Sequence, residues 1–107
     1  MTQIQALKRD NLLVDFLCQH KGKDNIVSAK EICEFLNERG YRAKPDSINT
    51  IIRKVMFDRR LPICSANSKG YFWATSKGEI QATVDGLQGR IEEMQKRIEH
   101  LQSFIIN

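Results

Sequence analysis

The sequence has little of the chemistry on which enzymes and metal proteins depend. Its cysteines are odd in number, widely spaced and without a CxxC pair: Cys18, Cys33 and Cys64. The two histidines, His20 and His100, have no partner at ligand spacing, and the chain lacks a glycine-rich phosphate loop, an HExxH motif and a Ser/His/Asp arrangement. We therefore expect no enzyme activity, no cofactor, no metal site and no small-molecule substrate, and we interpret the cysteines as structural thiols.

Long apolar runs are also missing. No stretch approaches the roughly 18 apolar residues that a membrane-spanning helix needs, and residues 1–5 lack the pattern of a signal peptide. The hydrophobic content of 41% and the charged content of 28% are typical of globular proteins. We therefore expect a cytoplasmic protein with no membrane partner.

What the sequence does contain is a regular apolar ladder over its last third. The gaps alternate between four and three residues, which is the spacing of a coiled-coil seam: Ile80, Val84, Leu87, Ile91, Met94, Ile98, Leu101 and Ile105. β-Branched residues occupy all four a positions and Leu-like residues most d positions, a pattern that favours two parallel strands. The ladder therefore predicts a homodimer that forms through a C-terminal helix.

The ladder divides the chain into a globular part, 1–75, and a dimerisation helix, 76–107. About 75 residues make a small domain that gains from oligomerisation. Glutamines at the e positions and arginines at g are permissive, so an antiparallel pair or a third strand stays open. A capping box formed by Ser76 and Glu79 is expected to begin the helix.

Positive charge gathers in the globular part. Residues 1–75 contain thirteen lysines and arginines against eight acidic residues, whereas residues 76–107 contain four against five. Within 42–60 lie six basic and only two acidic residues. Such a cluster suits a polyanion, although a solvated surface would look the same.

Three helices are expected before residue 60. The first covers about 4–20, unless Asp10 caps a shorter helix. The second covers about 29–39, beginning at a capping box and ending at Gly40, and the apolar pair before it suits a single bridging strand. The third covers about 46–58, and its apolar stripe leaves a polar face outward.

A β-hairpin is expected to follow the third helix. Its strands are 61–65 and 71–75, joined by a loop at 66–70. Alternation sends Tyr71 and Trp73 to one face and Phe72 to the other. The predicted fold is thus mainly α with a small β-hairpin (α+β): a winged helix-turn-helix followed by a long C-terminal coiled-coil helix.

The third helix and the hairpin loop carry the candidate contacts to DNA. Asn pairs with adenine and Arg with guanine in the major groove, while Ser, Thr and Lys contact bases or phosphates. On this basis we select residues from the outward face of helix 46–58, from its N-terminus and from the loop: Lys44, Ser47, Asn49, Thr50, Arg53, Lys54, Asn67 and Lys69.

Residues 60–75, RLPICSANSKGYFWAT, resemble the wing of small phage and prophage winged-helix proteins. Those proteins have a Pro-Ile-x-Ser strand, a short loop and a Gly-Tyr-aromatic strand that leads into a helix, and the similarity covers about 25–105. The resemblance implies a winged-helix DNA-binding protein of a bacterial or phage-infected cell. It places the DNA-facing helix at 46–58 and the wing tip at 67–70.

The sequence as a whole predicts a dimeric protein that binds double-stranded DNA and regulates transcription or replication. The alternative is a winged-helix adaptor whose coil recruits a partner protein. A third interpretation, single-strand or RNA binding by stacking on Tyr71 or Trp73, is weaker because packing in the core and the hairpin accounts for these aromatics better.

Overall fold

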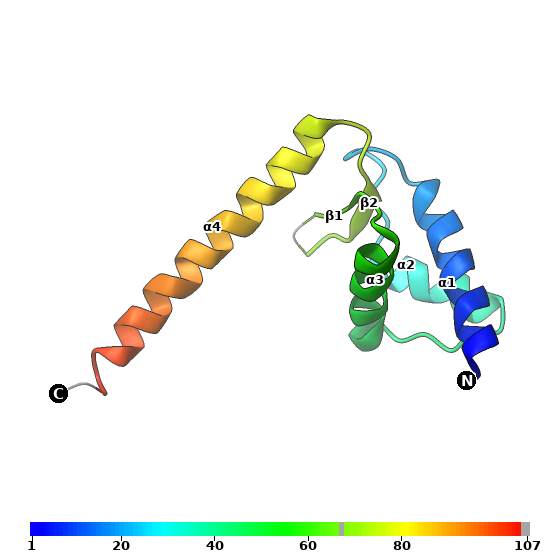
Figure 1. Cartoon of the computed structure of the whole chain (residues 1–107), viewed down its shortest axis with the longest axis horizontal. Helices are drawn as coiled ribbons and strands as arrows, with labels where there is room; N and C mark the ends of the chain where they lie inside the picture. Colours follow the sequence, from blue (N-terminus) through cyan, green and yellow to red (C-terminus); the bar gives the residue numbers. More distant parts are fainter. Residues whose placement is uncertain (67, 106–107) are drawn as a thin grey trace.

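The computed structural model describes residues 1–66 and 68–105, and it is mainly helical with a small two-stranded antiparallel sheet (Figure 1). The described elements follow the predicted order: α1 (Gln3–Cys18), α2 (Ala29–Glu38), α3 (Pro45–Arg59), β1 (Ile63–Ser65), β2 (Tyr71–Trp73) and α4 (Lys77–Gln102). Helices α1 to α3 gather around the sheet, and α4 leads away from them to the C-terminus. The α+β class expected from the sequence is confirmed.

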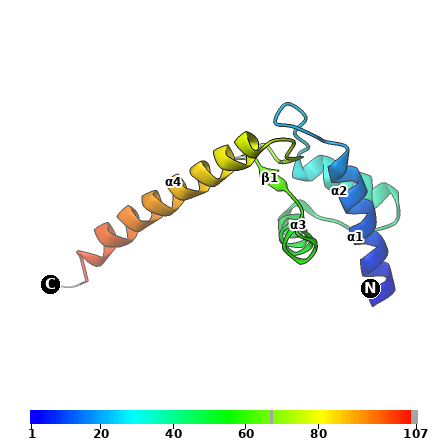
Figure 2. The ribbon, with the colours of Figure 1, turned by 45° about the horizontal axis from the view of Figure 1, so that its top comes forward.

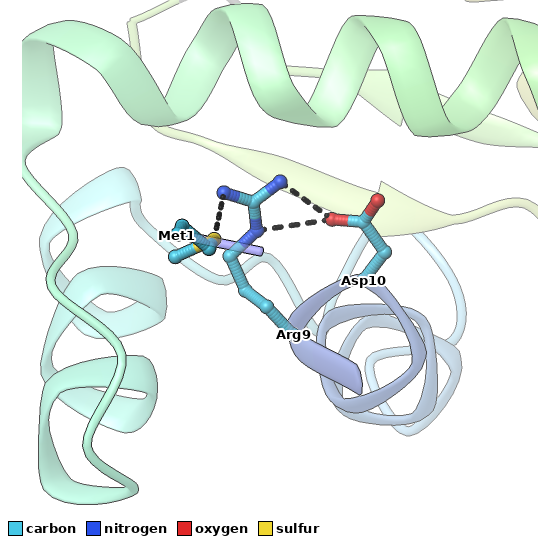
Figure 3. Close-up of polar contacts among 3 residues, drawn as sticks. All are labelled: Met1, Arg9 and Asp10. Atoms are coloured by element: carbon cyan, nitrogen blue, oxygen red, sulfur yellow. Dashed lines mark hydrogen bonds and ion pairs between the residues drawn. The ribbon is translucent and has the colours of Figure 1, made fainter. Parts of the chain in front are cut away.

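Helix α1 begins close to the N-terminus of the chain, at Gln3, and not at Asp10. Thr2 is the N-cap, and its hydroxyl accepts the Gln5 N–H while the Gln5 amide accepts the Thr2 N–H. Asp10 lies inside the helix, where it forms a 3.0 Å ion pair with Arg9, and the Arg9 guanidinium also reaches the Met1 sulfur (Figure 3). The shorter helix considered from the sequence is therefore wrong, because a complete capping box forms upstream.

Helices α2 and α3 are joined by a connection that side chains hold in place. The capping box of Ser28 and Glu31 opens α2 as predicted, and Gly40 follows its end with a φ of 86°. The side chain of Asn37 then clamps the backbone of Ala43: its oxygen accepts the Ala43 N–H at 2.8 Å and its amide donates to the Ala43 carbonyl at 3.2 Å. This clamp fixes where α3 begins.

The hairpin pairs β1 with β2, with Cys64 opposite Phe72. The predicted bridging strand before α2 is also present: Val27 and Tyr71 exchange two backbone hydrogen bonds of 2.8 Å. Gly70 makes this approach possible, because a Cβ atom on it would lie 2.1 Å from the Val27 carbonyl oxygen. The hairpin is thereby tied to the start of α2.

Two apolar clusters form the core. The larger joins α1, α2 and α3 with β1, and its fully buried members are Leu13, Leu17, Val27, Ile32, Leu36, Ile48 and Ile52. Strand alternation divides the aromatic run as predicted: Tyr71 and Trp73 pack against this cluster, while Phe72 belongs to a smaller one with Cys64 and Ala74. Packing therefore engages all three aromatic side chains.

Helix α4 packs only its beginning against the hairpin and then extends alone (Figures 1 and 2). The Ser76 hydroxyl caps it, but the second half of the predicted capping box does not form. Instead the Glu79 carboxylate accepts the backbone N–H groups of Thr75 at 2.7 Å and Lys23 at 2.8 Å. The reason is that the loop before α2 lies within reach, so Glu79 ties two distant segments together.

The last member of the apolar ladder lies beyond the end of its helix. Helix α4 ends at Gln102, so Ile105, predicted as the last a position, lies in the turn beyond it. There the backbone N–H groups of Phe104 and Ile105 donate to the carbonyls three residues earlier, which tightens the chain out of α-helical geometry. Among the described residues, no helix is both long and apolar enough to cross a membrane.

Candidate nucleic-acid interface

The candidate DNA residues of α3 lie outside the apolar stripe that this helix buries. Ile48, Ile52 and Val55 bury its inner stripe. Ser47, Thr50, Arg53 and Lys54 are exposed, as the sequence predicts, and Lys44 is the exposed N-cap residue. Asn67 lies outside the described residues, and Lys69 is exposed at the hairpin loop.

Asn49 differs from the other polar residues of α3. It is half-buried, and its side-chain oxygen accepts a hydrogen bond from the hydroxyl of Tyr71 on β2. Bidentate pairing with adenine uses both the side-chain oxygen and the NH2 group of an asparagine, and the bond from Tyr71 already occupies one of the two lone pairs of this oxygen. In this structure Asn49 connects α3 to the hairpin.

The Tyr71 hydroxyl sits in an environment set by both burial and charge. Burial raises the pKa of Tyr71 above its ordinary value of 10.0, and the nearby Arg53 guanidinium opposes that rise. Tyr71 therefore stays protonated at neutral pH and keeps donating to Asn49. This arrangement places the guanidinium of Arg53 beside the junction of α3 and β2.

A groove of about 610 Å³ opens along this junction. Its floor is partly apolar and includes Ile52, Met56 and Ile63. Its sides come from the first turn of α2, from α3, from the hairpin loop and from the first half of α4. Of the predicted DNA residues the groove brings together Asn49, Arg53 and Lys69, whereas the others described on α3 do not line it.

Every charged side chain that lines the groove is basic: Lys30, Arg53, Lys69 and Arg90. They come from three helices, α2, α3 and α4, and from the hairpin loop. Lys30, Arg53 and Lys69 form no ion pair with any residue that the structure describes. Converging cations without carboxylates among them raise the local concentration of anions, so the groove is suited to a polyanion.

Sequence reasoning missed several residues of this groove. Lys30 lies in the first turn of α2 and gave no local signal, and Arg90 was assigned only to the coil because of its heptad position. Phe57 was not selected either, yet it lines the groove and is 71% exposed in the middle of the polar face of α3. An aromatic residue one turn after Arg53 on that face was the available signal.

The apolar ladder of α4 forms a second exposed surface. All eight of its members are between 42% and 80% exposed in the single chain: Ile80, Val84, Leu87, Ile91, Met94, Ile98, Leu101 and Ile105. A stripe of this length on a 26-residue helix is unusual for a surface that stays in water. It is available for association.

The cysteines contribute to packing. Cys33 is buried in the larger cluster and Cys64 in the smaller one, and Cys18 is half-buried. Burial raises the pKa of the Cys33 thiol, and the nearby Glu34 carboxylate raises it further. The Cys33 thiol is therefore a poor nucleophile at neutral pH.

Comparison with known proteins finds no match: no protein-family model, no curated protein and no solved structure is significantly similar to this chain.

Proposed function

We propose that the chain is a homodimeric winged-helix protein that binds double-stranded DNA. In this proposal α3 is the recognition helix, the hairpin of β1 and β2 is the wing, and α4 is the dimerisation helix. Two observations of the fold support it. The short, clamped connection between α2 and α3 suits a helix-turn-helix, and the hairpin follows α3 directly.

The observation that carries the proposal is the charge of the groove beside α3. All four charged side chains along it are basic, and they converge from elements far apart in the sequence. DNA presents a dense line of phosphates, and each phosphate that a cation neutralises releases counterions. A groove lined in this way binds a nucleic-acid backbone while the exposed face of α3 meets the bases.

The outward residues of α3 have the chemistry for base contacts. Arg53 can pair with guanine, Thr50 can bond to bases or phosphates, and the exposed ring of Phe57 can contact a thymine methyl group. Lys44, Lys54 and Lys69 act as phosphate contacts that set the position of the helix. Ser47 lies one turn before Thr50 and extends the same face.

Pairing of α4 through its apolar ladder completes the proposed assembly. The heptad pattern is self-complementary, so the occupant of the exposed stripe is a second copy of this chain. Two linked copies convert the second contact with DNA into an intramolecular event, which raises the overall affinity without new contacts. The proposed biological role is regulation of transcription or replication by occupancy of a site.

The proposal is tested by fluorescence anisotropy of a labelled generic duplex at two salt concentrations. The full chain is compared with Arg53→Ala and with Lys8→Ala, which removes one exposed cation from α1. We expect salt-sensitive binding that Arg53→Ala weakens by about tenfold or more and that Lys8→Ala barely changes. Absence of duplex binding by the full chain at low salt would overturn the proposal.

A second candidate function, a protein-interaction adaptor, is favoured by the exposure of Phe57 and by the apolar floor of the groove. An acidic amphipathic helix would bury Phe57 and neutralise the basic rim. A folded dimer that ignores every duplex at low salt, yet binds such a peptide, would favour this function over DNA binding.

A further inference from the structure

Helix α4 has two functional sides next to each other. Its apolar ladder forms one side, and the groove beside α3 is walled by Thr83 and Arg90 of the adjoining side together with Leu87 of the ladder itself. In the heptad, Thr83 and Arg90 occupy g positions and Leu87 a d position. The groove therefore runs along the flank of the stripe on which we expect the second copy to pack.

The beginning of α4 is anchored to the rest of the fold. The Glu79 carboxylate accepts hydrogen bonds from the backbone of Thr75 and of Lys23, and the helix packs against β1. Arg90 follows Glu79 by eleven residues, which is about 16 Å along a helix at 1.5 Å per residue. The anchor thus determines where Arg90 stands relative to α3.

Arg97 provides the natural comparison, because it occupies the next g position of the same helix. It lies one heptad further from the anchor, about 10 Å along the axis, and it does not line the groove. Both arginines are exposed and both flank the same stripe. They differ in their distance from α3 and the hairpin.

We propose that Arg90 is a phosphate contact of the DNA site, so that α4 forms one wall of that site as well as joining the two chains. This inference rests on the proposed function, and it assigns to α4 a role in binding that the heptad alone does not require. Arg90 extends the basic rim beyond α3 and the hairpin. The rigid helix then fixes the spacing of the two grooves in a dimer.

The test compares Arg90→Gln with Arg97→Gln in the full chain, which lose the same charge at equivalent heptad positions. Binding of a labelled duplex is measured across a series of salt concentrations, and sedimentation and thermal unfolding are measured on the same samples. We expect Arg90→Gln to weaken binding about fivefold and to reduce the slope of log K against log salt concentration by about 0.9 for each Arg90 of the dimer that contacts a phosphate. Arg97→Gln should leave the affinity and the slope at wild-type values.

Each other outcome is informative. Equal duplex binding by the two variants, with Arg53→Ala still impaired, overturns the role of Arg90 and leaves the proposed function standing. A loss of dimer or of folding in Arg90→Gln alone would assign its weaker binding to structure and would also overturn the inference. Absence of duplex binding by the wild-type chain would overturn the proposed function itself.

Discussion

Helices α3 and α4 each have an apolar stripe along one side, but the stripe of α3 is buried and the stripe of α4 is exposed. In α3 the stripe is buried within the chain, and Ile48, Ile52 and Val55 are 0%, 1% and 3% exposed. In α4 every member of the stripe is at least 42% exposed. The apolar side of α3 is buried when the chain folds, whereas the apolar side of α4 remains exposed to water.

The contrast between the two helices shows which side of each is exposed. Burial of apolar surface contributes about 25 cal/mol per Å², and α3 obtains it from α1, α2 and β1, so its polar face remains outward. Among the residues that the structure describes, α4 has no such neighbour beyond its first turns, so the same driving force would favour the proposed association with a second chain. We therefore expect the globular part to fold independently of concentration and α4 to pair in a concentration-dependent way.

The largest effect is expected from breaking the globular part at Gly70. Gly70→Ala places a methyl group 2.1 Å from the Val27 carbonyl oxygen, at a residue whose φ is 138°. We expect the free energy of unfolding to fall by about 3 kcal/mol or more, measured by urea denaturation followed through Trp73 fluorescence.

The matched control for this change is Gly40→Ala, which also has a positive φ but no atom within 4 Å of the new methyl group. It should cost only about 1 kcal/mol, the strain of the backbone alone. Similar losses at the two glycines would show that contact between the hairpin and the start of α2 adds little to stability.

The second largest effect is expected in α4, where it tests the proposed pairing of two chains. Ile91→Asp puts a charge in the middle of the proposed seam, and we expect the dissociation constant of the dimer to rise by about 100-fold or more, measured by sedimentation equilibrium. Gly89→Asp introduces the same residue at an outer f position with open space around it. It should leave pairing intact, and equal dissociation of both variants would contradict the proposed seam.

A smaller effect is expected where α3 meets the hairpin. Tyr71→Phe removes the hydroxyl that donates to Asn49, and we expect a loss of about 1 kcal/mol in the free energy of unfolding. Tyr41→Phe is the control, because the Tyr41 hydroxyl bonds to no residue that the structure describes. An unchanged thermal midpoint in Tyr71→Phe would remove the structural role assigned to this bond.

The smallest effect is expected at the anchor of α4 and depends on pH. Hydrogen bonds from the Thr75 backbone, and then from the Lys23 backbone, lower the pKa of Glu79 below its ordinary value of 4.5. Because the folded pKa is the lower one, this stabilisation is fully present above about pH 4.5 and is lost as the pH falls through the folded pKa.

Thermal unfolding of the wild type and of Glu79→Gln should therefore differ at neutral pH and converge in acid. Glu93→Gln, on the outer side of α4, serves as the control and should follow the wild type throughout. A constant gap between Glu79→Gln and the wild type down to the most acidic conditions would contradict the assigned contacts.

Local signals in the sequence predicted most of the fold. The capping box at Ser28 and the glycine after α2 each act within one turn, so they can be read without knowing any distant neighbour. Two predictions about helix caps were wrong, in each case because a competing hydrogen bond forms in the folded chain. A capping box upstream of Asp10 begins α1. The carboxylate of Glu79 accepts a hydrogen bond from a loop 56 residues away instead of completing a capping box with Ser76.

The candidate site was less predictable than the fold. Periodicity placed Arg53 and Thr50 on the outer face of α3, because helical spacing alone decides which side chains share a face. It could not show that Asn49 is held by Tyr71 across the hairpin, nor that Lys30 and Arg90 line the same groove as Arg53. Those contacts depend on the relative positions of α2, α3, α4 and the hairpin, which no local pattern in the sequence determines.

The spacing of residues a few positions apart was enough to predict the helices, the hairpin and the two apolar stripes. Which stripe is buried and which is exposed depends on tertiary packing, and so does the convergence of four basic residues from three helices and the hairpin loop beside α3. Burial and charge convergence are properties of packed surfaces. A surface exists only after distant parts of the chain have come together.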